Sequence, residues 1–222
     1  MKTIRRLPLS LVLVLFSTPI ISGQDLSMYR KFALGTSLAA LSKQVGQDSQ
    51  QANLIHQSPA VIQELTYWPL DTSYSSVRTE SASQILFSFY NGKLYRMVVT
   101  YDREAIEGLT EEDMVKAISA RYGTATRFYP EIDILANDEF APKVIARWED
   151  SGNSINLFRS SSLNSFRLAV FSKSMDVQAA AAIAESLKLE KEEAPQKEID
   201  RRKSEADTLE TARQKNMKNF RP

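Results

Sequence analysis

The clearest pattern of hydrophobic and polar residues lies in the middle of the chain. Residues 85–90 and 93–101 are two runs rich in aromatic and β-branched residues, and only Asn91 and Gly92 separate them. An Asn-Gly pair between two such runs is the strongest short-range signal for a type I′ turn. The sequence therefore predicts a β-hairpin over residues 85–101.

The turn also predicts which residues of the hairpin share a face, because a two-residue turn fixes the register of its strands. The pairs expected on the core face are Phe89 with Leu94, Phe87 with Arg96, and Ile85 with Val98. The opposite face is too apolar for plain solvent surface and too rich in tyrosine for plain core. It is either covered by another element of the same chain or an interaction face. Its candidate interaction residues are Leu86, Tyr90, Tyr95, Met97, Val99 and Tyr101.

Two helices are predicted from the signals at their ends. Thr36 or Ser37 can cap the first, and its apolar residues recur at helical spacing until Gly46 ends it. Thr110 caps the second, three acidic residues follow in its first turn, and Gly123 closes it. The two helices lie at similar places in the two halves of the chain.

Further strands are expected before and after the second helix. The predicted strands are residues 60–68, 143–149, 154–159 and 165–172. Polar or irregular segments between the elements predict loops at residues 47–58, 71–83 and 129–142. Strands joined by hairpins, with helices between the groups, are typical of an α+β fold.

The order of these elements predicts the domain organisation. We expect an α+β domain over residues 24–189, an antiparallel sheet with helices packed on one face. Residues 35–107 and 108–189 are possible related halves, since each opens with a glycine and a hydroxyl residue, runs a helix to a closing glycine and continues into strands. Residues 190–222 are expected to form a separate, charged helical tail.

The tail differs in composition from the helix before it. Residues 175–189 are rich in alanine and are expected to pack closely on the domain, whereas residues beyond Pro195 are densely charged, with opposite charges at i,i+4 spacing. Pro195 is expected to break or kink the chain near residues 193–196. The only plausible apolar seam in this tail consists of Ile199, Ala206 and Leu209, which is too thin for a coiled coil. The tail is thus either a solvated, fraying helix or a helix that docks on a partner.

The first 23 residues have the three parts of a signal peptide. Lys2, Arg5 and Arg6 are followed by an apolar run that is too short to span a membrane and by small residues near Gly23. We therefore expect cleavage after residue 23 and a periplasmic or extracellular mature protein without a membrane span. An uncleaved anchor is the alternative.

The composition of the mature chain argues against several classes of function. Removing the three basic residues of the leader leaves 25 basic against 27 acidic side chains, which argues against a nucleic-acid partner. The chain has no cysteine, so packing rather than disulfides must stabilise it outside the cell. The seven glycines form no phosphate-binding loop, and no cofactor is predicted.

Candidate chemistry is sparse. His56 is the only histidine, and without cysteines a zinc site would need carboxylates beside it. A cluster of four acidic residues in one predicted loop could serve a carboxylate-based hydrolase or a weak cation site, although its spacing fits neither specifically. Its members are Glu131, Asp133, Asp138 and Glu139.

The first predicted helix resembles a known pattern. Gly35-Thr36-Ser37 with Leu41, Val45 and Gly46 is similar to the helix opening of the BamE (SmpA/OmlA) envelope proteins and of the β-lactamase-inhibitor-protein repeat. In the second half Gly108-Leu109-Thr110 fits, but the helix to Gly123 is about one turn longer, and neither glycine is followed by the proline of those families. The resemblance implies an exported helix-over-sheet module that binds proteins.

Together these features favour a non-enzymatic binding or assembly module of the cell envelope, with another envelope protein as its partner. A hydrolase that uses the acidic residues 131–139 is the alternative. A deep pocket lined by two carboxylates would favour the enzyme, and an exposed apolar surface would favour the binding module.

Overall fold

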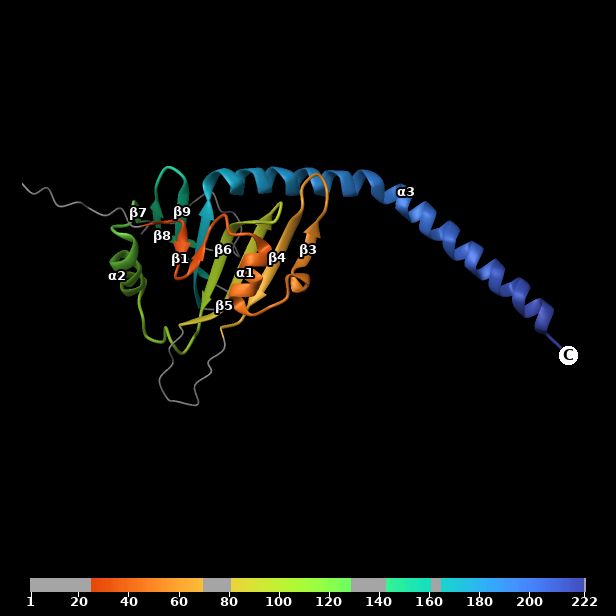
Figure 1. Ribbon diagram of the computed structural model, residues 1–222, viewed down its shortest axis with the longest axis horizontal. Helices are drawn as coiled ribbons and strands as arrows, with labels where there is room; N and C mark the ends of the chain where they lie inside the picture. Colours follow the sequence, from red (N-terminus) through yellow and green to blue (C-terminus); the bar gives the residue numbers. More distant parts are fainter. Residues whose placement is uncertain (1–24, 70–80, 129–142, 161–164, 222) are drawn as a thin grey trace, which may run out of the picture.

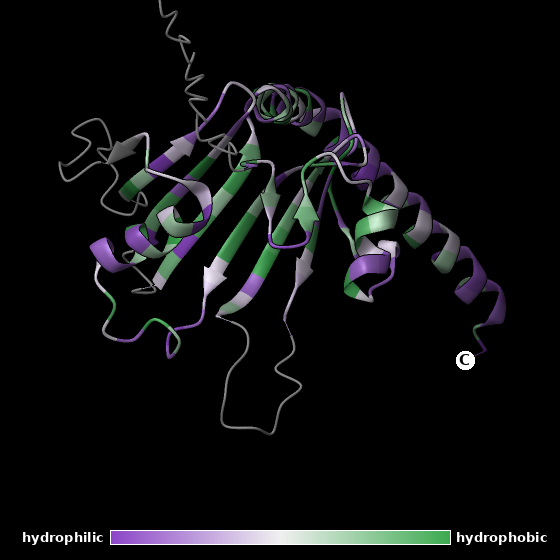
Figure 2. Cartoon of the chain, turned by 60° about the vertical axis from the view of Figure 1, so that its left-hand side comes forward, coloured by the Kyte–Doolittle hydropathy of each residue, from purple (hydrophilic) through white to green (hydrophobic). Residues whose placement is uncertain are grey.

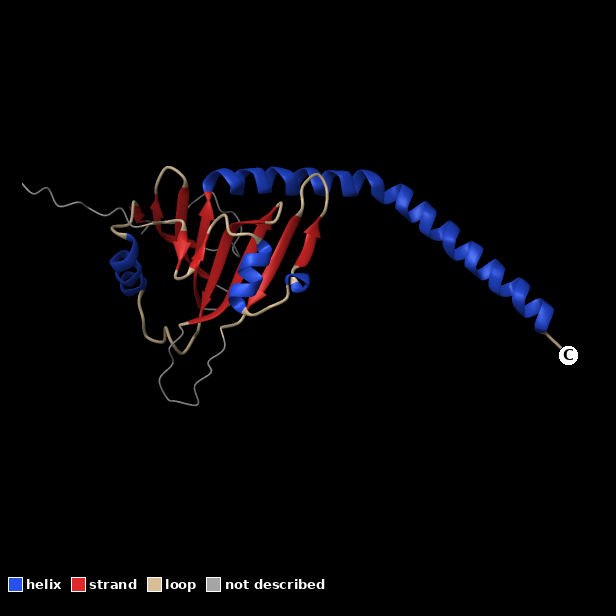
Figure 3. Cartoon of the chain, viewed as in Figure 1, coloured by secondary structure: helices blue, strands red, loops and turns tan. Residues whose placement is uncertain are grey.

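The centre of the protein is one antiparallel sheet of eight strands, seen in red in Figure 3. The computed structural model describes residues 25–69, 81–128, 143–160 and 165–221. The order across the sheet is β3-β4-β5-β6-β10-β9-β8-β7. The strands are β3 (Asn53–His56), β4 (Ile62–Tyr67), β5 (Ala82–Tyr90), β6 (Lys93–Tyr101), β7 (Arg127–Phe128), β8 (Lys143–Glu149), β9 (Asn153–Ser160) and β10 (Ser165–Ser172).

This strand order divides the sheet into two wings with the same topology. In the first wing helix α1 (Leu38–Val45) precedes β3 to β6, and in the second α2 (Glu111–Tyr122) precedes β7 to β10. Each set of four strands is a simple antiparallel meander. The last strands of the two meanders, β6 and β10, pair with each other at the centre. The α+β class is confirmed, and each half of the chain builds one wing.

The ends of α1 and α2 follow the signals in the sequence. Ser37 caps α1 by accepting a hydrogen bond from the Ala40 amide at 3.3 Å, and Gly46 ends it in the left-handed conformation. Thr110 and Asp113 form a reciprocal capping box at the start of α2. Both caps satisfy backbone N–H groups that have no partner within the helix.

Helices α1 and α2 cover the same face of the sheet (Figure 2). A short hairpin, β1 (Met28–Tyr29) and β2 (Phe32–Ala33), and a 3-10 turn (Ser49–Gln51) complete this layer. The buried core beneath this layer contains side chains from the two helices, the hairpin and the sheet. Its helical and hairpin members include Phe32, Leu41, Met114 and Ile118, and its sheet members include Phe87, Met97, Ile155 and Leu168.

The third helix, α3 (Lys173–Asn219), begins on the opposite face of the sheet. Ala179 of α3 is buried together with Ile62 and Tyr95. Ile62 lies on β4, three positions before the core residue Leu65. Residues an odd number of positions apart in a strand point to opposite faces, so this small cluster lies behind the main core. Residues 175–189 and the charged tail form one continuous helix rather than two separate ones (Figure 3).

The hairpin of β5 and β6 is confirmed, but its predicted register is only partly right. Asn91 and Gly92 both have positive φ, and Phe89 lies opposite Leu94 as expected. Beyond that pair the register shifts by one, so that Phe87 faces Met97 and Ile85 faces Val99. The cause is a β-bulge at Tyr95, an extra residue in β6.

The bulge has a clear physical reason. In the unbroken register the charged side chain of Arg96 would lie beside Phe87 in the core. With the extra residue, Met97 enters the core and Arg96 turns to the other face, where it binds Asp176 of α3.

Some strands lie where the sequence predicts loops. β3 falls within residues 47–58, and β5 begins at Ala82, inside the expected loop 71–83. β3 is a short edge strand whose residues are mostly exposed, so it shows no apolar alternation. The predicted loop at residues 129–142 lies outside the described residues.

Candidate binding surfaces

The six residues predicted as one interaction face do not share a face. Met97 and Val99 are fully buried in the main core, and Tyr101 packs against that cluster. Tyr95 is buried on the other side of the sheet beneath α3, beside Tyr90. Leu86 is half-buried on that side. The bulge at Tyr95 divides the set, because it reverses the facing of every residue after it in β6.

The first part of α3 crosses one end of the sheet and is held at several points (Figure 1). Lys173 Nζ binds Asp150 O at 2.6 Å and Glu149 Oε2 at 3.0 Å, and Arg96 Nε donates to Asp176 Oδ1 at 2.8 Å. Small residues face the sheet further along, namely Ala179, Ala182 and Ser186. The spacing of three and four residues puts them on one side of the helix and permits close packing, as the alanine-rich composition predicts.

His56 fastens the helix to the edge strand β3. Its Nδ1 lies 2.9 Å from Ser186 Oγ and 3.3 Å from Glu190 Oε1, and its side chain is 10% exposed. The histidine thus joins β3 to α3 across 130 residues of sequence, and its role here is structural. Among the described residues, no three histidine, cysteine or acidic side chains are grouped so that they could hold a metal ion.

Beyond this contact α3 leaves the domain. We call residues 192–221 the arm; all of its residues are exposed except Glu198, which is half-buried. Pro195 lies inside the helix, and Figure 1 shows α3 changing direction after it passes β3. The proline does not break the helix. The bend agrees with the expected kink, because proline removes one helical hydrogen bond and clashes with the preceding turn.

Apolar side chains of the arm line up along one side. We call this set the apolar seam; it consists of Ile199, Ala206, Leu209, Met217 and Phe220. Successive separations of seven, three, eight and three residues are sums of three- and four-residue steps, which keep side chains on one helical face. The large members are strongly exposed, from 59% for Ile199 to 75% for Phe220.

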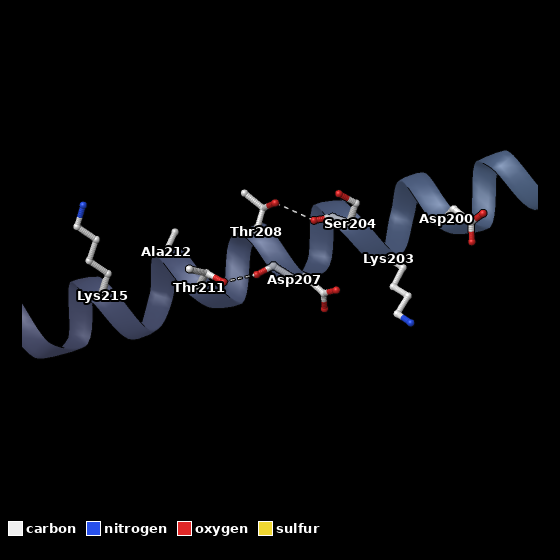
Figure 4. A pocket seen from close by; sticks show the side chains of 8 residues that line it. All are labelled: Asp200, Lys203, Ser204, Asp207, Thr208, Thr211, Ala212 and Lys215. Carbon is white, nitrogen blue, oxygen red and sulfur yellow. Dashed lines mark hydrogen bonds between the residues drawn. The ribbon is translucent and has the colours of Figure 1, made fainter.

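The side of the arm away from the seam is polar. A hollow there is lined by Asp200, Lys203, Ser204, Asp207, Thr208, Thr211, Ala212 and Lys215, and Figure 4 shows these side chains along the helix. All of these residues come from the same helix, so no opposite wall closes the hollow. Thr208 and Thr211 use their hydroxyls to bind carbonyls one turn earlier in the helix, those of Ser204 and Asp207.

Charge is unevenly distributed along the arm. Residues 192–210 carry seven acidic and four basic side chains, whereas residues 211–221 carry four basic side chains and no acidic one. Exposed ion pairs such as Lys197–Glu193 and Arg213–Glu210 link neighbouring turns. Such pairs add little stability in water, so they do not by themselves account for a helix of this length.

A concave site lies on the other side of the molecule, between α2 and the β1–β2 hairpin. This pocket has a volume of about 340 Å³. Its buried floor consists of Tyr29, Ile106, Met114, Ile118, Tyr122 and Leu168. Arg30, Ser81, Leu109, Ala117 and Arg121 are more exposed and form its rim. Tyr101 also lines it, so one member of the predicted interaction face contributes to this site.

The tyrosines of the pocket remain neutral over a wide pH range. Burial raises the pKa of Tyr29 and of Tyr122 above 10.0. Burial, reinforced by the neighbouring phenols of Tyr29 and Tyr122, raises the pKa of Tyr101 well above 10.0. Tyr122 donates its hydroxyl to the Met28 carbonyl at 2.9 Å, which ties α2 to β1.

These pKa shifts predict a loss of stability at alkaline pH. Above about pH 10, where unfolded tyrosine ionises, the unfolded chain binds fewer protons than the folded chain. The free energy of unfolding is therefore expected to be insensitive to these three groups below about pH 10 and to fall as the pH rises further. Urea unfolding followed by circular dichroism, with phenolate absorbance to count ionised tyrosines, checks this. Titration of all tyrosines at their ordinary pKa would contradict it.

The acidic residues of the predicted hydrolase site, Glu131, Asp133, Asp138 and Glu139, lie outside the described residues. The hydrolase therefore stays a prediction. In the part of the chain that the structure describes, the residues that line the pocket include no carboxylate and no histidine.

The fold and these surfaces define a two-winged α+β protein with a projecting helix. Residues 27–176 match the TP0088 domain family, and the chain belongs to this family. The matched segment covers both wings and ends in the first turn of α3, so the arm lies beyond it. Neither the curated proteins nor the solved structures contain a match to the chain. The resemblance to BamE and to the β-lactamase-inhibitor-protein repeat stays a prediction.

In the ranges that the structure describes, none of the helices combines the length and the apolar character that crossing a bilayer requires.

Proposed function

We propose that this protein is an exported, non-enzymatic binding module of the cell envelope and that the arm of α3 docks on another envelope protein. The observation that carries the proposal is the apolar seam, which is held away from the domain on a helix whose first part is fixed to the sheet. Most helices gain their stability by burying an apolar face. In this chain the domain does not bury the seam, so a partner is the natural surface to do so.

The partner's chemistry follows from the arm. An amphipathic helix binds by laying its apolar side into a groove, with anchor residues at helical spacing. The groove should be apolar along the seam and acidic where it meets residues 211–221, which carry only basic charges. The export that this function needs is supported by the signal-peptide pattern of residues 1–23.

Charge substitutions in the seam test the proposal. Burying a leucine or methionine side chain contributes about 1.5–3 kcal/mol, so replacing both Leu209→Glu and Met217→Glu should weaken partner binding by more than about 100-fold. Because the arm does not touch the domain, the fold should not change. The measurement is quantitative mass spectrometry of proteins that co-purify with the tagged mature protein from envelope extracts.

Thr208→Glu is the matched control, because it adds a charge to the polar side of the same helix, outside the basic residues 211–221. We expect the partner to be retained by the wild type and the control and lost from the double variant. Recovery of the same proteins with all three chains would overturn the proposal.

A further inference from the structure

The floor of the pocket between α2 and the β1–β2 hairpin suits an aliphatic chain. The floor is lined by the branched aliphatic side chains of Ile106, Ile118 and Leu168 and by the unbranched side chain of Met114. The unbranched methionine side chain adapts to irregular apolar shapes. The volume of about 340 Å³ is at the lower end of the range of about 300–1,000 Å³ found for small-molecule sites, which favours one short chain rather than a bulky ligand.

The rim of the pocket is basic. The Arg121 guanidinium lies 5.6 Å from the ring centre of Tyr122, and that of Arg30 lies 5.5 Å from the ring centre of Tyr29. Arg30 also donates to Ser81 Oγ at 3.4 Å. The planar N–H donors of a guanidinium match carboxylate and phosphate oxygens.

The backbone at Arg30 is a second, independent observation. Arg30 forms the turn between β1 and β2 with a φ of 54°, in the left-handed region that normally favours glycine or asparagine. A glycine there would relieve the backbone at no steric cost. Residues held in such conformations cluster at ligand-binding sites, and here the strained residue places a cation on the rim of the pocket.

We propose that this pocket binds a single-chain anionic amphiphile, with the aliphatic chain on the floor and a carboxylate or phosphate head at Arg121 and Arg30. The phenols of Tyr29, Tyr101 and Tyr122 also line the pocket. A neutral phenol does not repel an anion, although the Tyr122 hydroxyl is already donated to the Met28 carbonyl and is not available to the head group. This site would be a function of the TP0088-domain part of the chain, separate from that of the arm.

Calorimetric titration of the full mature protein tests the proposal. The probes are dodecanoate and dodecyl phosphate, both below their micelle-forming concentrations, with dodecyltrimethylammonium as the cationic comparison. We expect saturable binding of one probe molecule per chain for at least one of the anions and none for the cation. Preference for dodecanoate would identify a free fatty acid as the source of the head group, and preference for dodecyl phosphate a phospholipid-derived one.

Two variants on α2, each with a matched control, locate the site. Arg121→Gln removes the rim charge, and Ala117→Leu fills the pocket; each should weaken binding about tenfold or more. Lys116→Gln and Ala120→Leu make the same changes at exposed positions of α2 that do not line the pocket, and they should bind like the wild type. No saturable binding of either anion, equal binding of the cation, or equal losses in variants and controls would overturn the proposal.

Discussion

Replacing Trp148 by alanine is expected to lower the free energy of unfolding by about 3–5 kcal/mol, the range for removing a large aromatic side chain from a core. Trp148 on β8 is 1% exposed. Its indole N–H donates to the Gly123 carbonyl at 2.9 Å and lies 3.3 Å from Ser119 Oγ. The side chain thus joins the sheet of the second wing to the end of α2. Its removal leaves a cavity and an unpaired carbonyl.

The chain contains a control for this prediction. Trp68, the only other tryptophan, is 58% exposed, and its replacement by alanine should change the free energy of unfolding by no more than about 0.5 kcal/mol. Denaturant unfolding followed by far-ultraviolet circular dichroism measures both without relying on tryptophan fluorescence. Similar losses for the two variants would show that the packing of the second wing is not as described.

Ending the chain after Lys191 is expected to abolish partner binding while leaving the domain intact. The truncation removes the whole arm and keeps Glu190 and its contact with His56. Since residues 192–221 are almost entirely exposed, the free energy of unfolding should change by less than about 0.5 kcal/mol, or about 1–2 °C in Tm for a chain of this size.

Thermal melts of the full-length and truncated proteins check the first part of this prediction, and co-purification checks the second. A fall in Tm of many degrees would mean that the arm packs on the domain. Retention of the partner by the truncated chain would assign binding to the wings instead.

Local signals allowed much of the fold to be predicted. The caps at Ser37 and Thr110, the closing glycines and the Asn91-Gly92 turn act over a few residues, and each marks the element it bounds. In the second wing β8, β9 and β10 were predicted within one residue because their runs are apolar and bounded by turn residues, whereas the two-residue strand β7 was not predicted. The wings' shared topology follows from the repeated order of these signals.

What could not be predicted depends on contacts between distant residues. The bulge at Tyr95 exists because Arg96 has a partner on α3, 80 residues away. Nothing in the sequence near His56 indicates its contact with Ser186. The pocket is assembled from β1, β6, β10 and α2, which lie far apart in the sequence. Of its members only Tyr101 was predicted from the sequence as a binding residue, and the left-handed turn at Arg30 has no residue signal at all. The formation of β3 and the continuity of α3 through Pro195 likewise depend on the surrounding structure.

The most direct test of the proposed function is photo-cross-linking from single positions of the arm in living cells. A photoreactive phenylalanine analogue is placed at Leu209, in the apolar seam, or at Thr211, two residues further and on the opposite side of the helix. The proposed docking predicts one adduct of defined mass from Leu209 and little or none from Thr211. No adduct from Leu209, or equal adducts from both positions, would contradict it.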